Sequence, residues 1–181
     1  MKRFGACLLV TMVTISFTAG VTFAANVHLK QHRNPTFSDK GLTLQAVGFL
    51  AGLGNEDLLV TLSATGNPTA TCTNPSGATQ PPGQNPAEVT LTGAQSIPAE
   101  EVKNGTVKFD VSTEPPVSPI PGAPDCPNRL WTETITDVAF TSATITVEQP
   151  AGTTVLTVSC TFSSPTVNGA VPSANVTCTQ L

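Results

Sequence analysis

The chain has 181 residues, of which 39% are hydrophobic and 11% are charged, and its formal net charge is −4. Globular domains usually carry about a quarter charged residues, so this chain is poor in charge, yet its apolar content excludes a charge-rich disordered protein. The length allows one domain or two very small ones, and the acidic balance argues against nucleic acid and anionic membranes as partners.

The first 24 residues have the organisation of an export signal. A short basic start precedes an almost wholly apolar or small stretch, 4–23, and Ala24 and Ala25 supply the small residues of a cleavage site. We predict a signal peptide over 1–24, with cleavage after Ala25 as the alternative, and hence a secreted chain that no longer touches the membrane. A single membrane anchor is the competing interpretation, because the apolar run is about long enough to span a bilayer. Loss of this segment leaves six basic residues against twelve acidic ones.

The next segment, 25–40, shows no hydrophobic period. It contains three of the six basic residues that remain after the signal: Lys30, Arg33 and Lys40. We interpret it as an extended N-terminal arm that precedes a single folded domain over 41–181.

The rest of the chain is rich in Thr and Val and is interrupted by Pro and Gly, which is typical of strands and turns. The clearest alternation lies over 105–113, where Val107, Phe109 and Val111 share one face, as in a half-buried strand. Eight or nine short strands at this spacing favour an all-β fold, an antiparallel β-sandwich of immunoglobulin-like architecture. The expected strands cover 42–50, 58–65, 69–73, 87–91, 105–113, 131–138, 139–148, 153–162 and 174–179.

Four cysteines follow the signal: Cys72, Cys126, Cys160 and Cys178. An even number in an exported chain predicts two disulfides, whereas a zinc site needs more closely spaced pairs. We favour Cys160–Cys178, because both residues would face inward on strands that one loop can join. That choice leaves Cys72–Cys126, while a Cys72–Cys160 bond across two sheets stays open.

Few residues are suited to catalysis. The two histidines, His28 and His32, both lie in the arm, and mobile termini hold catalytic geometry poorly. Glu133 and Asp137 would share a strand face about 13 Å apart, wider than the roughly 5–9.5 Å of glycosidase carboxylates. We therefore expect no enzymatic activity, and a carboxylate-based hydrolase is the least favoured function.

Three residues are candidates for a binding surface: Trp131, Glu56 and Asp57. Trp131 follows the Pro-rich stretch 114–128 and offers a large ring at the rim of a loop. Glu56 and Asp57 place oxygen ligands in a turn, as calcium prefers, but the turn lacks the alternating acids of an EF-hand loop. We expect no cofactor, and calcium is the one cation for which the sequence offers ligands.

These features predict a secreted, non-enzymatic β-sandwich that acts as a binding or structural module at a cell surface or in an extracellular matrix. Its partner would be a protein or a surface polymer. One alternative is a polymerising surface subunit, whose arm adds as a strand to a neighbouring sheet. Another is a secreted effector or inhibitor, which needs the same stable scaffold and variable loops.

Overall fold

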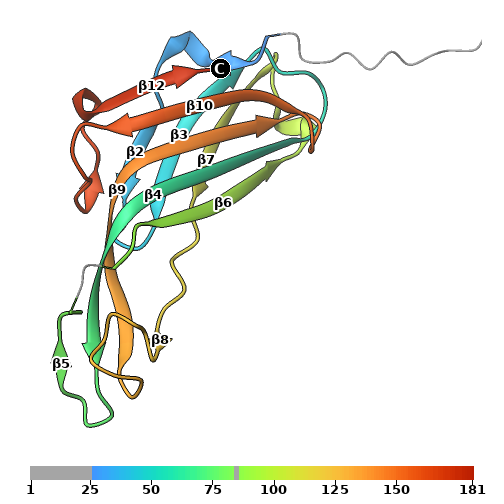
Figure 1. Ribbon diagram of the computed structural model, residues 1–181. Coiled ribbons are helices and arrows are strands. Elements are labelled where there is room, and N and C mark those ends of the chain that lie inside the picture. Colours follow the sequence, from blue (N-terminus) through green and yellow to red (C-terminus); the bar gives the residue numbers. More distant parts are fainter. Residues whose placement is uncertain (1–25, 84–85) are drawn as a thin grey trace, which may run out of the picture.

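The computed structural model describes residues 26–83 and 86–181. The predicted signal peptide, 1–24, lies outside these residues. The described chain is all-β and forms two antiparallel sheets packed as a sandwich, as predicted (Figure 1). Within the described ranges, no helix is both long and apolar enough to cross a membrane.

Sheet A is built around β3, which pairs with β7 along one edge and with both β1 and β2 along the other, while β11 pairs with β2. Its strands are β1 (His28–Leu29), β2 (Thr36–Asp39), β3 (Leu44–Ala51), β7 (Thr106–Ser112) and β11 (Gly169–Ala170). Sheet B has the order β12-β10-β9-β4-β6 across the sandwich and lies in front of sheet A in Figure 1. Its strands are β4 (Leu58–Thr73), β5 (Thr79–Gln80), β6 (Val89–Ile97), β8 (Ile120–Pro121), β9 (Thr132–Glu148), β10 (Thr154–Phe162) and β12 (Val176–Gln180).

The described residues form twelve strands, more than the eight or nine expected. Four of the twelve, β1, β5, β8 and β11, are only two residues long, and such short pairings carry no periodic signal in the sequence. Three single turns of 3-10 helix complete the fold: η1 (Lys30–His32), η2 (Ala99–Glu101) and η3 (Ser173–Asn175).

The core lies between the sheets and follows the period-two alternation of the long strands. In β4, Val60 and Leu62 are fully buried, whereas Thr61 and Ser63 face outward. Phe109 of β7 is also fully buried, and it sits against Gly48 of β3. A Cβ at position 48 would lie 2.5 Å from the Phe109 ring, so only glycine leaves room for that ring.

Residues 26–39 belong to the sandwich instead of forming an arm outside it. β1 and β2 both pair with β3, and Val27, Leu29 and Phe37 are buried. The Phe37 ring meets Phe162 edge to face, with centroids 5.2 Å apart. No hydrophobic period is visible over these residues because two short strands are separated by residues that leave the sheet.

Two strands are much longer than predicted. The breaks expected at 66–68 and 138–139 do not occur: β4 and β9 run through as a continuous pair, and register shifts near Gly66 and Ala70 absorb the irregular residues. The far halves of these strands, 66–73 and 132–139, project from one end of the sandwich together with β5 and β8 (Figure 1). We call this projection the extension.

Both favoured disulfides are confirmed. Cys160 and Cys178 are direct partners in the β10–β12 ladder, with Cα atoms 4.1 Å apart. Cys72 in the extension binds Cys126 in the loop that precedes β9. The Cys72–Cys160 alternative is therefore wrong, and neither bond joins the two sheets as in an immunoglobulin domain.

Candidate functional site

The most distinctive site on the molecule is a gap in sheet A beside β3. On that side β1 ends at Leu29, which pairs with Leu50, and β2 begins at Thr36, which pairs with Val47. Between these two ladders the N-terminal segment has six residues, but β3 has only two. The surplus cannot lie in the plane of the sheet, so the chain must rise out of it.

The six surplus residues, 30–35, form an arch over Gly48 and Phe49. The turn η1 begins the arch, and Gln31 reverses the chain in the left-handed region, with φ of 58°. Neither Gly48 nor Phe49 has a strand partner on this side. The carbonyl of Leu44 accepts a hydrogen bond from the N–H of Thr113, which directly follows β7. The backbone groups of successive residues in an antiparallel strand face alternate sides, so the N–H and C=O of Phe49, five positions after Leu44, face the gap.

The arch is fastened at both ends. Leu29 is buried, and its N–H donates to Oε1 of Gln180 in β12 at 2.9 Å. At the other end Pro35 is buried, and Nδ2 of Asn34 lies 3.5 Å from the carbonyl of Val176. The arch thus spans from sheet A to the edge strand of sheet B, which fixes its position above the gap.

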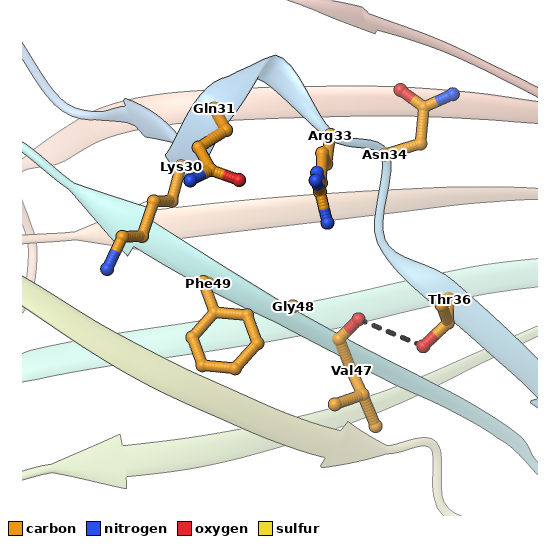
Figure 2. Close-up of a pocket in the computed structure, with 8 residues that line it drawn as sticks. All are labelled: Lys30, Gln31, Arg33, Asn34, Thr36, Val47, Gly48 and Phe49. Carbon is orange, nitrogen blue, oxygen red and sulfur yellow. Dashed lines mark hydrogen bonds between the residues drawn. The ribbon is translucent and has the colours of Figure 1, made fainter.

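Beneath the arch lies a groove with a volume of about 420 Å³. Figure 2 shows Lys30, Gln31 and Arg33 pointing from the arch toward the β3 side, where the Phe49 ring lies, while the Asn34 side chain points away. A hydrogen bond from Thr36 Oγ1 to the carbonyl of Val47, 3.3 Å long, borders the groove at the start of β2.

The groove combines positive charge with an exposed aromatic ring. Lys108 and Asp110 form the single ion pair of the described residues, so neither Lys30 nor Arg33 forms an ion pair with a described carboxylate. Phe49 is 52% exposed, although large apolar side chains are usually covered. In a chain of net charge −4, this is a local cationic and aromatic site.

The predicted binding residue Trp131 lies elsewhere. It is half-buried in the extension, where it packs on a small cluster formed by Cys72, Ala123 and Cys126. Its ring therefore supports the disulfide at this end of the molecule. The neighbouring Leu130 is 73% exposed.

Glu56 and Asp57 lie in the turn before β4, at the other end of that strand from Trp131. The 16 residues of β4 span about 50 Å, so the three predicted residues do not form one surface. Asp57 Oδ1 accepts a hydrogen bond from Ala99 N at 2.9 Å. The Glu56 carbonyl accepts one from the buried Gln149. The turn thus has structural contacts, and the described residues contain no group of three or more potential metal-binding side chains.

The carboxylates considered for hydrolysis are also separated. Glu133 is buried in the extension, where burial and then the charge of Asp125 raise its pKa. Asp137 lies near Gly41 at the base of the extension. Each has one buried oxygen without a hydrogen-bond partner: Glu133 Oε1 and Asp137 Oδ1. His28 Nδ1 lies 2.8 Å from the carbonyl of Asn26.

A second groove, of about 490 Å³, runs between β6 and the Pro-rich segment. Val89, Leu91, Pro115, Val117 and Ile135 give it a largely apolar lining. Thr90, Thr92 and Glu114 also line it, but it has no cation and no aromatic ring. The groove under the arch combines both, so it is the stronger candidate.

Sequence reasoning missed the residues of that groove, although two signals were present. Half of the basic residues outside the predicted signal peptide lie in 25–40. Phe49 also occupies the outward phase of its strand, which is unusual for a large apolar residue. Comparison with known proteins adds no assignment, since no protein-family model and no curated protein matches the chain.

Proposed function

We propose that the chain is exported and acts as a non-enzymatic binding module whose groove under the arch takes an anionic ligand. Two formed disulfides support export, because such bonds persist in oxidising compartments. The observation that carries the binding proposal is the pair of cations, Lys30 and Arg33, which lie beside the exposed ring of Phe49 and form no ion pair with a described carboxylate.

An acidic polysaccharide fits this chemistry best. The flat apolar face of Phe49 can pack on the C–H face of a sugar ring. The guanidinium of Arg33 matches a carboxylate in a two-pronged geometry, and Lys30 adds a second charge. The side chains of Gln31 and Thr36 border the same groove and can hydrogen bond to sugar hydroxyls.

The volume of about 420 Å³ is within the usual range for ligand sites. The polymer is the surface partner expected for a secreted module. A polymerising subunit is less favoured, because its arm would have to leave a sheet in which Val27, Leu29 and Phe37 are buried.

Isothermal titration calorimetry with polygalacturonate tests the proposal, with uncharged dextran as the comparison ligand. We expect binding to polygalacturonate alone, and we expect it to weaken as salt screens the charges. Arg33→Gln should weaken binding at least about tenfold, since a hydrogen bond to a charged group contributes roughly 1.5–3 kcal/mol.

Arg129→Gln is the matched control, because Arg129 is an exposed arginine in the loop next to the extension. It should bind like the unmodified protein. Equal affinities of Arg33→Gln and Arg129→Gln would contradict the assignment of the groove, as would a lack of polygalacturonate binding. Tight binding to an acidic protein in place of the polymer would favour an effector or inhibitor.

A further inference from the structure

The outer face of sheet B carries a regular array of hydroxyl groups. Three rows of outward residues cross its strands, and thirteen of their fourteen positions are Thr or Ser. The first row is Thr177, Thr161, Ser142, Thr65 and Thr90; the second is Thr179, Ser159, Thr144, Ser63 and Thr92; the third is Thr157, Thr146, Thr61 and Ala94. We call these three rows the hydroxyl face. It is the face turned away from sheet A, because residues between these positions, such as Leu62 and Ile145, are buried in the core.

Most of these hydroxyls have no partner within the described protein. Thr65 and Thr90 bond to each other at 3.1 Å, and Thr179 lies 3.5 Å from the carbonyl of Ser159. The other ten hydroxyls of the rows make no hydrogen bond to described residues. The rows contain no ionisable side chain and no aromatic ring. The β propensity of Thr accounts for single positions, but solvent-facing strands also accept charged residues, and these three rows contain none. The next row of the same face does carry a carboxylate, Glu148, which pairs with Leu59 and Thr154.

The absence of charge limits what can bind this face. A charged partner would gain no ion pair, so the complementary partner is uncharged. A dissolved hydroxylated partner, such as a neutral sugar chain, would gain little, because each new hydrogen bond replaces one made to water. Ice differs from such a dissolved partner, because the water molecules that the hydroxyls already hold need not be displaced. They can themselves become part of the ice lattice.

The spacings of the array resemble those of tetrahedrally bonded water. Neighbouring strands are about 4.8 Å apart, and alternate residues of one strand are about 6.7 Å apart. In tetrahedrally bonded water, hydrogen-bonded oxygens are about 2.75 Å apart. This geometry places second-neighbour oxygens about 4.5 Å apart and gives a layer repeat of about 7.3 Å. The two repeats thus agree to within about a tenth in each direction.

From this charge-free array and its spacing we propose that the hydroxyl face binds ice. Adjacent strands twist by roughly 20–25°, so the match holds over neighbouring strands at the centre of the face, around Thr144 of β9. The activity is therefore one of slowing ice growth at the crystal surface. This proposal is independent of the anionic ligand of the groove, which lies under the arch beside β3 in sheet A.

The test measures thermal hysteresis, the difference between melting and growth temperatures of a seeded ice crystal, together with partition of the protein into growing ice. The purified protein should produce a hysteresis gap and enter the ice. Thr144→Lys should abolish both, because a long charged side chain at the centre interrupts the array. Ser112→Lys, the matched control, places the same side chain on the outward face of β7 in sheet A and should retain both.

Thr161→Lys is a second variant, at an exposed position of the first row, and its melting temperature is measured to check that the fold is kept. It should also lose ice binding. The proposal would be overturned if the unmodified protein left ice growth unchanged, or if both lysine variants on the face matched Ser112→Lys. Retention on microcrystalline cellulose that Thr144→Lys removes, without any effect on ice, would equally overturn it in favour of a neutral polysaccharide.

Discussion

A single buried amide, Gln149, holds the turn that precedes β4. The side chain is 2% exposed and makes three hydrogen bonds to backbone groups. Its Oε1 accepts from Gly54 N at 2.8 Å, and its Nε2 donates to the carbonyls of Gly54, at 3.1 Å, and Glu56, at 2.8 Å. Gln149→Leu keeps a side chain of similar size but removes all three bonds.

We expect Gln149→Leu to lower the free energy of unfolding by about 3 kcal/mol. Each backbone group left without a partner costs about 1–3 kcal/mol, and the lower end applies because the turn is partly open to water. For a domain of this size the melting temperature should fall by about 6–12 °C, at about 2–4 °C for each kcal/mol.

Urea unfolding and calorimetry measure these changes. Gln45→Leu is the matched control, since Gln45 is a half-buried glutamine whose amide donates to Asp110 on an outer face. Water can replace that bond, so the loss should stay within about 0.5 kcal/mol. The reasoning would be refuted if the free energy of unfolding of Gln149→Leu fell by less than about 1 kcal/mol, or by no more than that of Gln45→Leu. The backbone groups of this turn would then not carry the expected cost of lacking a hydrogen-bond partner.

Three further predictions concern the extension. Burial, with Asp125 nearby, raises the pKa of Glu133 above its ordinary value of 4.5, so the folded state holds this proton more tightly and loses stability as pH rises through the raised pKa. Glu133→Gln should therefore raise the calorimetric melting temperature relative to the unmodified protein at pH 7 but not at pH 4, and equal differences at both values would oppose this reasoning. Joint replacement of Cys72 and Cys126 by Ala should lower the urea midpoint and cost about 4 kcal/mol for a sequence separation of 54; an unchanged midpoint would show that the bond does not stabilise the fold. Trp131→Ala should make the extension sensitive to limited proteolysis while the sandwich stays resistant, because the ring packs on the cluster at the disulfide and not on the main core; an unchanged cleavage pattern would exclude that role.

Much of the fold follows from local patterns in the sequence. The alternation of Val107, Phe109 and Val111 predicts a strand with one buried face, and the structure confirms it. The inward phase of Cys160 and Cys178 likewise predicts their bond. In both cases the period of two residues is set by the strand itself and needs no knowledge of distant partners.

The extension could not be predicted in the same way. Gly66 and Pro68 are ordinary strand breakers, yet the β4–β9 pair passes through both, with register shifts on either side. Such shifts also change which residues face inward, so the alternation in 132–148 resembles two strands when only one is present. Whether a strand pair continues beyond the sandwich depends on where the other sheet ends, which no local pattern records.

The groove depends on a still more distant relation. The arch exists because the β1 and β2 ladders differ in register against β3, leaving six residues opposite Gly48 and Phe49. The basic residues of 25–40 are visible in the sequence, but their meeting with Phe49 follows from pairing between segments. The distance between the candidate residues Trp131 and Asp57 also follows from pairing, since β4 separates them by its full length.

The most direct test of the groove as the ligand site is a map of ¹H–¹⁵N chemical-shift changes during titration with a galacturonate oligosaccharide. The largest changes should fall on the arch, 30–35, and on the backbone amide of Phe49, and they should disappear in Arg33→Gln. Changes confined to other surfaces, or spectra that the oligosaccharide leaves unaltered, would contradict the assignment.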